Sequence, residues 1–253
     1  MKIIMLAKDS RSSRIMYNSI NKEFSISKVI FESDVDKYKL LKRRIKRLGT
    51  LRVFGQILFQ LLIVKVLKKI SSKRIGLYIE SFDFNTTAVG EEKIIRVNSV
   101  NEEQTIENIK EIDPDIILVN GTRIISSKVI DCTNATIVNT HVGITPKYRG
   151  VHGAYWALVN NDYENVGVTV HLIDKGIDTG GIIYQEKIVI DSKDNFVTYP
   201  ILQLDKGITL LKYTIKDIIE GKLSVKENDL ESKLWSHPTL WEYLYYRIVK
   251  NIK

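Results

Sequence analysis

The chain has 253 residues, of which 44% are hydrophobic, so its length and composition indicate a globular protein with a full core. Its net charge of +8 favours an anionic partner, but residues 37–74 hold thirteen Lys or Arg and no Asp or Glu, and the rest of the chain is net negative. Because the bulk of the protein is not basic and the basic block lacks a recognised motif, we do not expect a nucleic-acid partner.

The N-terminal apolar run, residues 3–7, is too short for a secretion signal. The single cysteine, Cys132, excludes an internal disulfide and fits a reducing compartment; we expect it to be inert. These features predict a cytoplasmic protein.

Apolar strands alternate with helical segments along most of the chain. Short apolar runs indicate the strands, and apolar residues at helical spacing indicate the helices, one of which is broken by the sequence DPD at 113–115. The expected elements are strands at 2–7, 116–121, 135–141, 166–174 and 181–190, and helical segments at 14–22, 102–113, 124–130, 151–160 and 202–222. This alternation predicts an α/β fold, with a Rossmann-like, mostly parallel sheet and helices on both faces.

A basic, helical insertion at 37–75 interrupts this alternation. Its apolar stretch, 53–67, is shorter than the roughly twenty residues that span a bilayer, so we expect it not to cross a membrane. One interpretation of residues 43–74 is a helical subdomain packed on the core, with solvated lysines. A second is a peripheral helix on an anionic membrane, at the inner membrane surface. A phosphate or nucleic-acid patch is a third.

Polar residues with catalytic potential appear where the strand at 135–141 ends. Side chains two residues apart in a strand point to the same face, so Asn139 and His141 can address one small molecule. Asp178 lies in a glycine-rich turn before the strand at 181–190, and ligand sites in such sheets lie beyond the carboxyl ends of the strands. An amide, an imidazole and a carboxylate together suit acyl transfer. Taken singly, Asn139 could close backbone hydrogen bonds, His141 could be a strand-end histidine, and Asp178 could shape its turn.

Three motifs, in order and spacing, resemble the folate-dependent formyltransferase family. They are IILVNGTRIIS at 116–126, NTH followed by GITPKYRG within 139–150, and DKGIDTGGIIYQEKI at 174–188. The resemblance implies that Asn139, His141 and Asp178 are the catalytic residues and that 10-formyltetrahydrofolate is the formyl donor. It places the folate against a loop and a turn whose residues are Thr122, Arg123, Ile124, Ile125, Asp174 and Ile177. We expect no metal, because the four histidines and one cysteine lack metal-ligand spacing.

The branches of this family differ outside the motifs. The methionyl-tRNA branch carries a further C-terminal barrel, whereas 63 residues follow Ile190 here, and the hydrolase branch carries an N-terminal regulatory domain, whereas the first strand begins here at residue 2. The glycinamide ribonucleotide branch has a glycine-rich phosphate loop where this chain has AKDSRSSR. The resemblance therefore favours an amino-sugar acceptor, carried on a nucleoside diphosphate and destined for surface polysaccharide. The residues proposed to bind it are Lys8, Ser10, Ser12, Ser13, Lys147, Tyr148 and Arg149.

Alternatives remain for the function and for the remaining segments. Glycinamide ribonucleotide or another small amine is a second acceptor, and a non-catalytic folate-binding, nucleotide-sugar-binding or membrane-surface protein is a reading of a different class. Residues 1–222 are expected to form the catalytic domain and 223–253 an aromatic-rich tail, which docks as a terminal helix on the core or on the partner of a homodimer, or stacks on a sugar or base. His171 is given a structural role, with a place beside the catalytic residues as its alternative.

Overall fold

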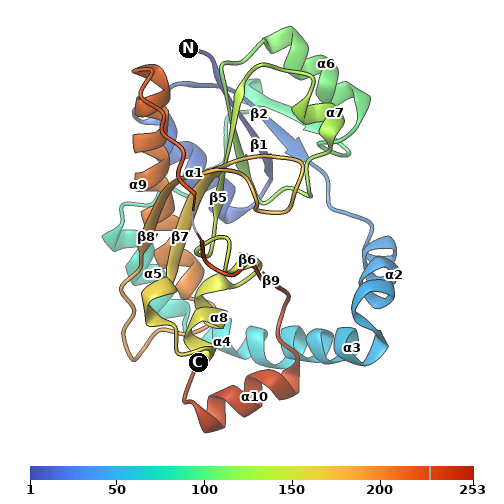
Figure 1. The fold of residues 1–253 in the computed structure, drawn as a ribbon, viewed down its shortest axis with the longest axis vertical. Coiled ribbons are helices and arrows are strands. Elements are labelled where there is room, and N and C mark those ends of the chain that lie inside the picture. Colours follow the sequence, from blue (N-terminus) through green and yellow to red (C-terminus); the bar gives the residue numbers. More distant parts are fainter. Residues whose placement is uncertain (228) are drawn as a thin grey trace.

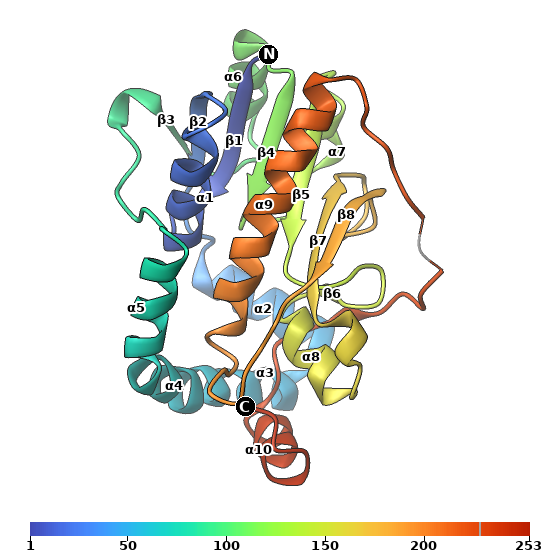
Figure 2. The same cartoon turned by 90° about the vertical axis from the view of Figure 1, so that its left-hand side faces the viewer.

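A seven-stranded sheet forms the centre of the molecule, and helices cover both of its faces (Figures 1 and 2). The computed structural model describes residues 1–227 and 229–253; residue 228, within the predicted tail, lies outside the described residues. The strand order is β3-β2-β1-β4-β5-β7-β8, in which β3 to β5 run parallel and β7 and β8 are antiparallel to their neighbours. The strands are β1 (Ile3–Lys8), β2 (Ile26–Glu32), β3 (Ile94–Val97), β4 (Ile116–Asn120), β5 (Thr136–His141), β7 (Gly167–Leu172) and β8 (Ile182–Lys187). The predicted α/β fold with a mostly parallel sheet is confirmed.

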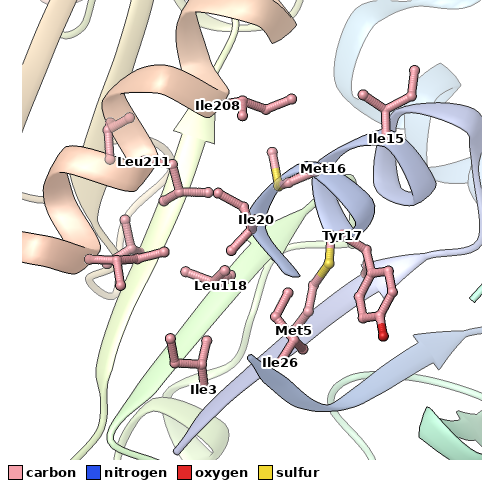
Figure 3. Close-up of a cluster of buried hydrophobic side chains, with 14 of the residues drawn as sticks. Ile3, Met5, Ile15, Met16, Tyr17, Ile20, Ile26, Leu118, Ile208 and Leu211 are labelled. Carbon is pink, nitrogen blue, oxygen red and sulfur yellow. The ribbon is translucent and has the colours of Figure 1, made fainter. Parts of the chain in front are cut away.

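Two apolar layers hold the helices on the sheet. Helices α1 (Arg11–Asn21) and α9 (Tyr199–Ile219) pack on one face, where Met5, Ile20 and Leu211 are among the buried side chains (Figure 3). Helices α6 (Glu103–Ile112) and α7 (Ser127–Ile130) pack on the other face. The remaining short elements are η2 (Glu91–Lys93), β6 (Arg149–Gly150), α8 (Gly153–Val159), η3 (Tyr163–Asn165), β9 (Leu234–Trp235) and α10 (Leu240–Val249).

Some predicted boundaries are wrong, for local reasons. Helix α1 begins at Arg11 rather than at 14, because Ser10 caps it and accepts a hydrogen bond from the backbone of Ser13 at 3.3 Å. Helix α9 begins at Tyr199 rather than at 202, with a proline in its first turn, where a fixed φ suits a helix start. Strand β8 ends at Lys187 rather than at 190. Strands β2 and β3 were not expected from the sequence.

The basic insertion forms a chain of helices. They are α2 (Lys37–Leu48), α3 (Thr50–Leu58), the π-helix η1 (Phe59–Val64), α4 (Lys65–Ile70) and α5 (Ser72–Ser81). From α3 to α4 the helix is continuous for 21 residues and contains an 18-residue window with a mean hydropathy of 1.6, which is long and apolar enough to cross a membrane by length and composition. The expectation that the segment is too short to span a bilayer is therefore wrong. Core helices of soluble proteins satisfy the same criterion, so it assigns no membrane by itself.

One side of this long helix packs into the fold. Phe59, Val64 and Leu67 are buried with residues of α8, α9 and α10 in a second apolar cluster. The ring of Phe59 lies 5.1 Å from that of Tyr243 on α10. Strand β9 of the tail pairs in parallel with β6, and α10 packs beside α3, so the tail and the insertion build this end of the molecule together.

Candidate active site

Two strand ends and one turn bring the predicted catalytic residues together. Asn139 and His141 lie on β5, and Asp178 lies in the turn between β7 and β8. The register of β5 and β7 places Asn139 opposite His171. Asp178 adopts a φ of 51°, a left-handed conformation that side chains other than glycine rarely take, and this turn directs its carboxylate toward the end of β5.

Hydrogen bonds to the protein fix the ring of His141, which is 4% exposed. Its Nε2 lies 2.8 Å from the backbone oxygen of Tyr148, and since a carbonyl only accepts, Nε2 carries a proton. Its Nδ1 therefore faces Asp178, whose Oδ2 lies 3.4 Å away and also accepts a hydrogen bond of 3.0 Å from the amide of Gly150. The Nδ1–Oδ2 distance exceeds that of a close charge-assisted hydrogen bond, and His141 is among the residues that line the adjoining cavity.

His171 orients the Asn139 side chain. The Nδ1 of His171 lies 2.7 Å from the backbone oxygen of Leu172 and must donate to it, so a neutral ring offers Nε2 as an acceptor. Burial, together with the neighbouring His141, lowers the pKa of His171 and favours that neutral form. The amide Nδ2 of Asn139 lies 3.2 Å from this Nε2 and donates to it. His171 thus contacts a predicted catalytic residue directly, as well as bracing the strand end.

The three residues line a cavity of about 600 Å³. The loop after β4 and the turn before β8 form part of its wall, and all six residues predicted to bind a folate are among those that line it: Thr122, Arg123, Ile124, Ile125, Asp174 and Ile177. A cavity of this size suits a small organic ligand.

Two of these six residues hold the wall in shape. The guanidinium of Arg123 pairs with the buried Glu32 at 2.5 Å and donates to the backbone oxygens of Ser33 and Asn98 at 3.0 Å each. Asp174 accepts hydrogen bonds from the Gly176 amide at 2.9 Å and from the Thr179 hydroxyl at 2.8 Å. Their side chains therefore fix the loop and the turn, and leave the backbone and the apolar side chains beside them to meet a ligand.

The basic insertion and the tail form another part of the cavity wall, where the sequence offered ligand contacts for both segments only as alternatives. The residues that they contribute are Leu40, Arg44, Arg47, Leu48, Gln56, Leu234, Trp235, Ser236 and His237. Arg44 donates to the side chain of Gln56 at 2.6 Å, and Gln56 is fully buried and donates to the His237 backbone oxygen at 2.6 Å. Burial and the adjacent Arg47 lower the pKa of Arg44. Two cations thus lie close together here, where an anion would relieve their repulsion.

The residues predicted to bind an acceptor lie outside the cavity lining. Within the described part of the chain, the cavity lining includes none of Lys8, Ser10, Ser12, Ser13, Lys147, Tyr148 or Arg149. Lys8 pairs with Asp34 at 2.5 Å, and the three serines form hydrogen bonds with one another at the start of α1. Lys147 and the buried Tyr148 both contact Asp162, at 2.6 and 2.8 Å, and Arg149 donates to the Ile177 backbone oxygen at 2.9 Å. The structure does not bring these seven residues together at one ligand.

No group of three or more His, Cys, Asp or Glu side chains placed to hold a metal ion occurs in residues 1–227 and 229–253. The polar side chains of the cavity instead form hydrogen bonds with one another and with the backbone.

A pair of histidines beside the cavity makes stability depend on pH. His152 Nε2 lies 3.0 Å from His237 Nδ1, and burial lowers the pKa of His152 to about 3 and that of His237 to about 4. Both rings are neutral in the folded protein at pH 7 but take up protons on unfolding below about pH 6.5. The free energy of unfolding is therefore expected to fall as the pH drops from 7 to 4, and this contribution is constant above pH 7.

Replacing His237 with asparagine is expected to reduce that pH dependence, by up to about 1.4 kcal/mol per pH unit between pH 4.5 and 6. Urea unfolding of both proteins across pH 4.5–7.5 measures the difference. Because carboxylates titrate in both proteins, their contribution cancels in the comparison. Parallel curves for the two proteins would contradict the prediction.

Comparison with known proteins places most of this architecture in one family. A model of the formyl transferase family matches residues 64–208. Methionyl-tRNA formyltransferases from Caldanaerobacter subterraneus subsp. tengcongensis and Kosmotoga olearia are 32% identical over 143 residues and 34% identical over 137 residues. These alignments cover 55% and 54% of this chain but 46% and 44% of the relatives, so the chain spans about half the length of the curated relatives it matches.

Solved structures share the fold over more of the chain. A sugar N-formyltransferase from Shewanella sp FDAARGOS_354 superimposes with a TM-score of 0.57 and 16% identity, covering 93% of this chain and 76% of that one. The N-formyltransferase of Helicobacter canadensis, in complex with folinic acid and dTDP-3-aminofucose, gives 0.55 and 21%, with coverages of 93% and 71%. Glycinamide ribonucleotide transformylase 1 of Symbiobacterium toebii gives 0.56 and 15%, with coverages of 93% and 95%. At these identities the likeness concerns the fold.

Proposed function

The chain belongs to the formyl transferase family, and we propose that it is a cytoplasmic N-formyltransferase that moves the formyl group of 10-formyltetrahydrofolate to the amine of an amino sugar carried on a nucleoside diphosphate. The observation that carries this proposal is the convergence of Asn139, His141 and Asp178 in a cavity that is also lined by Arg44 and Arg47. The first set supplies the chemistry of acyl transfer, and the second supplies an anion-binding wall.

The cavity lining fits a folate as the formyl donor. Ile125, Ile173 and Ile177 offer apolar surface for a flat ring, and the backbone of the loop at 121–125 and of the turn at 174–178 offers hydrogen-bonding groups beside it. A structural neighbour solved with folinic acid and dTDP-3-aminofucose supports the pairing of a folate with a sugar nucleotide.

The roles of the three polar residues follow from their donors and acceptors. When bound, the folate supplies the formyl carbon, which bonds to the acceptor amine as its bond to the folate nitrogen breaks, and the proton lost by the amine ends on that nitrogen. Asn139 has a second amide N–H besides the one given to His171, and this N–H stabilises negative charge on the formyl oxygen. With a proton on Nδ1, His141 would add a second donor, beside the Asp178 carboxylate 3.4 Å away.

Asp178 also accepts the proton that the amine releases. Its carboxylate lies 3.4 Å from the His141 ring and 3.8 Å from the His171 ring, and a hydrogen bond of 3.0 Å from the Gly150 amide holds it in place. A carboxylate held in this way can relay a proton, directly or through a water, toward the folate nitrogen.

The cationic wall favours a phosphorylated acceptor. Guanidinium groups bind phosphate oxygens through strong, charge-assisted hydrogen bonds. Arg47 makes no ion pair in the described chain, and Arg44 donates to the neutral side-chain amide of Gln56. A diphosphate here would leave the sugar to reach toward Asn139 and His141 across the same cavity.

Replacing Arg47 with glutamine is expected to raise the KM for the acceptor by about 10- to 100-fold, because a hydrogen bond to a charged group contributes about 1.5–3 kcal/mol. The KM for the folate and kcat at saturating acceptor should change little. Steady-state kinetics with each substrate varied in turn measures this split. Arg43→Gln is the matched control, because Arg43 lies on the same helix but outside the cavity lining. If Arg43→Gln raises the KM for the acceptor as much as Arg47→Gln does, the increase reflects the positive charge of the helix rather than a phosphate contact at Arg47.

The experiment that tests the function is a spectrophotometric assay for release of tetrahydrofolate from 10-formyltetrahydrofolate. The acceptors are amino-sugar nucleotides, with glycinamide ribonucleotide and methionyl-tRNA as comparisons. Turnover with an amino-sugar nucleotide is the expected result. Turnover only with methionyl-tRNA or with the ribonucleotide would overturn the acceptor while keeping the reaction, and folate binding without transfer to any acceptor would favour a binding protein.

A further inference from the structure

Helix α10 turns an apolar face toward solvent, although it is docked on the protein. Its solvent-exposed side chains include Trp241, Leu244, Tyr245, Ile248 and Val249, at helical spacings of three and four residues. Such a stripe ordinarily packs inward. Ile248 is 80% exposed, whereas the opposite side of the helix, with Tyr243, is the side that packs on the protein. The apolar stripe of α10 is therefore available to a binding partner outside the described chain.

The long helix from α3 to α4 has an exposed apolar side too. Only 28% of its apolar window is buried, and the large side chains that remain exposed are Leu51, Phe54, Leu61, Leu62, Val66 and Ile70. Single exposed apolar residues are normal on a protein surface, but a run of them along 21 residues marks an interaction surface.

The two helices form one surface. The ring of Trp241 lies directly over Gly55, where any Cβ would overlap it, and Arg52 pairs with Glu242 at 3.2 Å. Both views of the fold place α3, α4 and α10 at the same end of the molecule, away from α6 and the N-terminus (Figures 1 and 2). We call this surface the apolar end; it consists of Leu51, Phe54, Leu61, Leu62, Val66, Ile70, Trp241, Leu244, Tyr245, Ile248 and Val249.

Cations without an acidic partner lie next to the apolar end, on the same long helix. Of the thirteen Lys and Arg in residues 37–74, Arg52 and Arg74 make ion pairs, and the other eleven have no acidic partner within ion-pair distance among the described residues. Lys65, Lys68 and Lys69 are exposed on the same helix as Val66 and Ile70. Long lysine side chains can lie along an apolar surface with the charge in water, which suits the boundary between acyl chains and headgroups.

We propose that the apolar end binds the surface of an anionic membrane, with α10 and the helix from α3 to α4 lying in the plane of the interface. The apolar side chains supply buried area and the unpaired cations supply attraction to anionic headgroups. The long helix lies on the membrane rather than crossing it, because Val53, Phe59 and Val64 remain buried in the fold and Gln56 keeps its hydrogen bonds to Arg44 and His237.

Charge decides against a second copy of the chain as the occupant. A two-fold dimer through this end would place the same patch of each subunit against the other, and so would bring two blocks of unpaired cations together. Like charges facing each other across an interface are costly. An anionic lipid surface has the complementary charge, and this proposal does not depend on the reaction that the cavity performs.

The test is flotation of the full-length protein with vesicles of phosphatidylcholine alone or mixed with phosphatidylglycerol, at low and high salt. The protein is expected to float with the anionic vesicles and at least tenfold less with the neutral ones. The double variant Leu62→Glu, Ile248→Glu should lose at least tenfold in binding. Ile219→Glu is the matched control, because Ile219 is also exposed, at 49%, but ends α9 away from this surface, and it should bind as the unchanged protein does.

Replacing Lys65, Lys68 and Lys69 with glutamine keeps the apolar residues and tests the charge separately. Binding to anionic vesicles should fall and lose most of its salt dependence. Equal binding to neutral and anionic vesicles, or an equal loss in Ile219→Glu, would overturn the proposal. A dimer that the double variant converts to monomer, without vesicle binding by either protein, would overturn it in favour of a subunit interface. Thermal unfolding of each variant checks that the fold is retained.

Discussion

Replacing His141 with alanine is expected to lower kcat for formyl transfer by about 10²- to 10⁴-fold, the range that positioned acid–base groups contribute. The imidazole is 4% exposed and is held at Nε2 by the Tyr148 backbone oxygen, so its Nδ1 is presented in one orientation. Losing it removes a donor to the formyl oxygen and the ring that the Asp178 carboxylate faces. The KM for the folate should change little, because His141 is outside the loop and turn that would hold the folate.

Asp178→Asn tests the other member of the same pair. Asparagine keeps the shape of the turn and tolerates the left-handed φ of 51°, but it removes the negative charge beside Nδ1. Because the two residues act as a unit, the double variant His141→Ala, Asp178→Asn should be no slower than the slower single variant by more than a few-fold. Rapid-quench or steady-state rates at saturating substrates measure this, and thermal unfolding controls for folding. If the rate loss of the double variant equals the product of the two single losses, the two side chains act independently.

Replacing Asn139 with alanine is expected to lower kcat by about 10²- to 10³-fold, the loss measured when one donor to a developing oxyanion is removed. His171 accepts one amide proton of Asn139 and thereby fixes which way the amide points. The substitution should leave the folate KM unchanged, because the interaction forms as charge develops on the formyl oxygen.

Asn139→Asp is the sharper variant. It has nearly the same shape but lacks the N–H donors, and it places a second carboxylate near Asp178. It should therefore be at least as slow as the alanine variant. His171→Gln, which keeps an acceptor near the amide, should retain more activity than either. An aspartate variant as active as the unchanged protein would remove Asn139 from the mechanism.

Local sequence patterns predicted the part of the site that lies at strand ends and in a glycine-rich turn. The two-residue period of a strand placed Asn139 and His141 on one face, and the glycine-rich turn placed Asp178 near them; the structure brings these three together. The alternation of apolar strands and helices likewise predicted the mostly parallel sheet. By contrast, β3 has four residues at the sheet edge, of which only Val97 is buried, so little apolar periodicity marks it.

Contacts between distant segments could not be predicted in this way. Arg44 and His237 meet at the cavity through Gln56, and the three come from a helical insertion and from the tail, about 180 residues apart in the chain. Nothing in the local sequence of either segment indicates the other. For Tyr148, the local sequence predicted a role that the structure does not show. Its polar ring, next to the catalytic motif, was expected to bind substrate, but the residue is buried, and its backbone oxygen is the group that contacts His141.

The π-helical turn at Phe59–Val64 determines how straight the exposed side of the long helix is. Leu58, Leu62, Val66 and Ile70 recur at every fourth residue, and in an α-helix each such step rotates a side chain by about 40°, so the row would wind around toward the buried side. A π-helix fits more residues into each turn and offsets that drift. The row therefore depends on the geometry of this turn as well as on composition: in a wholly α-helical segment, the three four-residue steps from Leu58 to Ile70 would add up to a rotation of about 120°. Apolar residues here can be exchanged for one another, but a change that removes the π-helical turn would move part of the row toward the buried side.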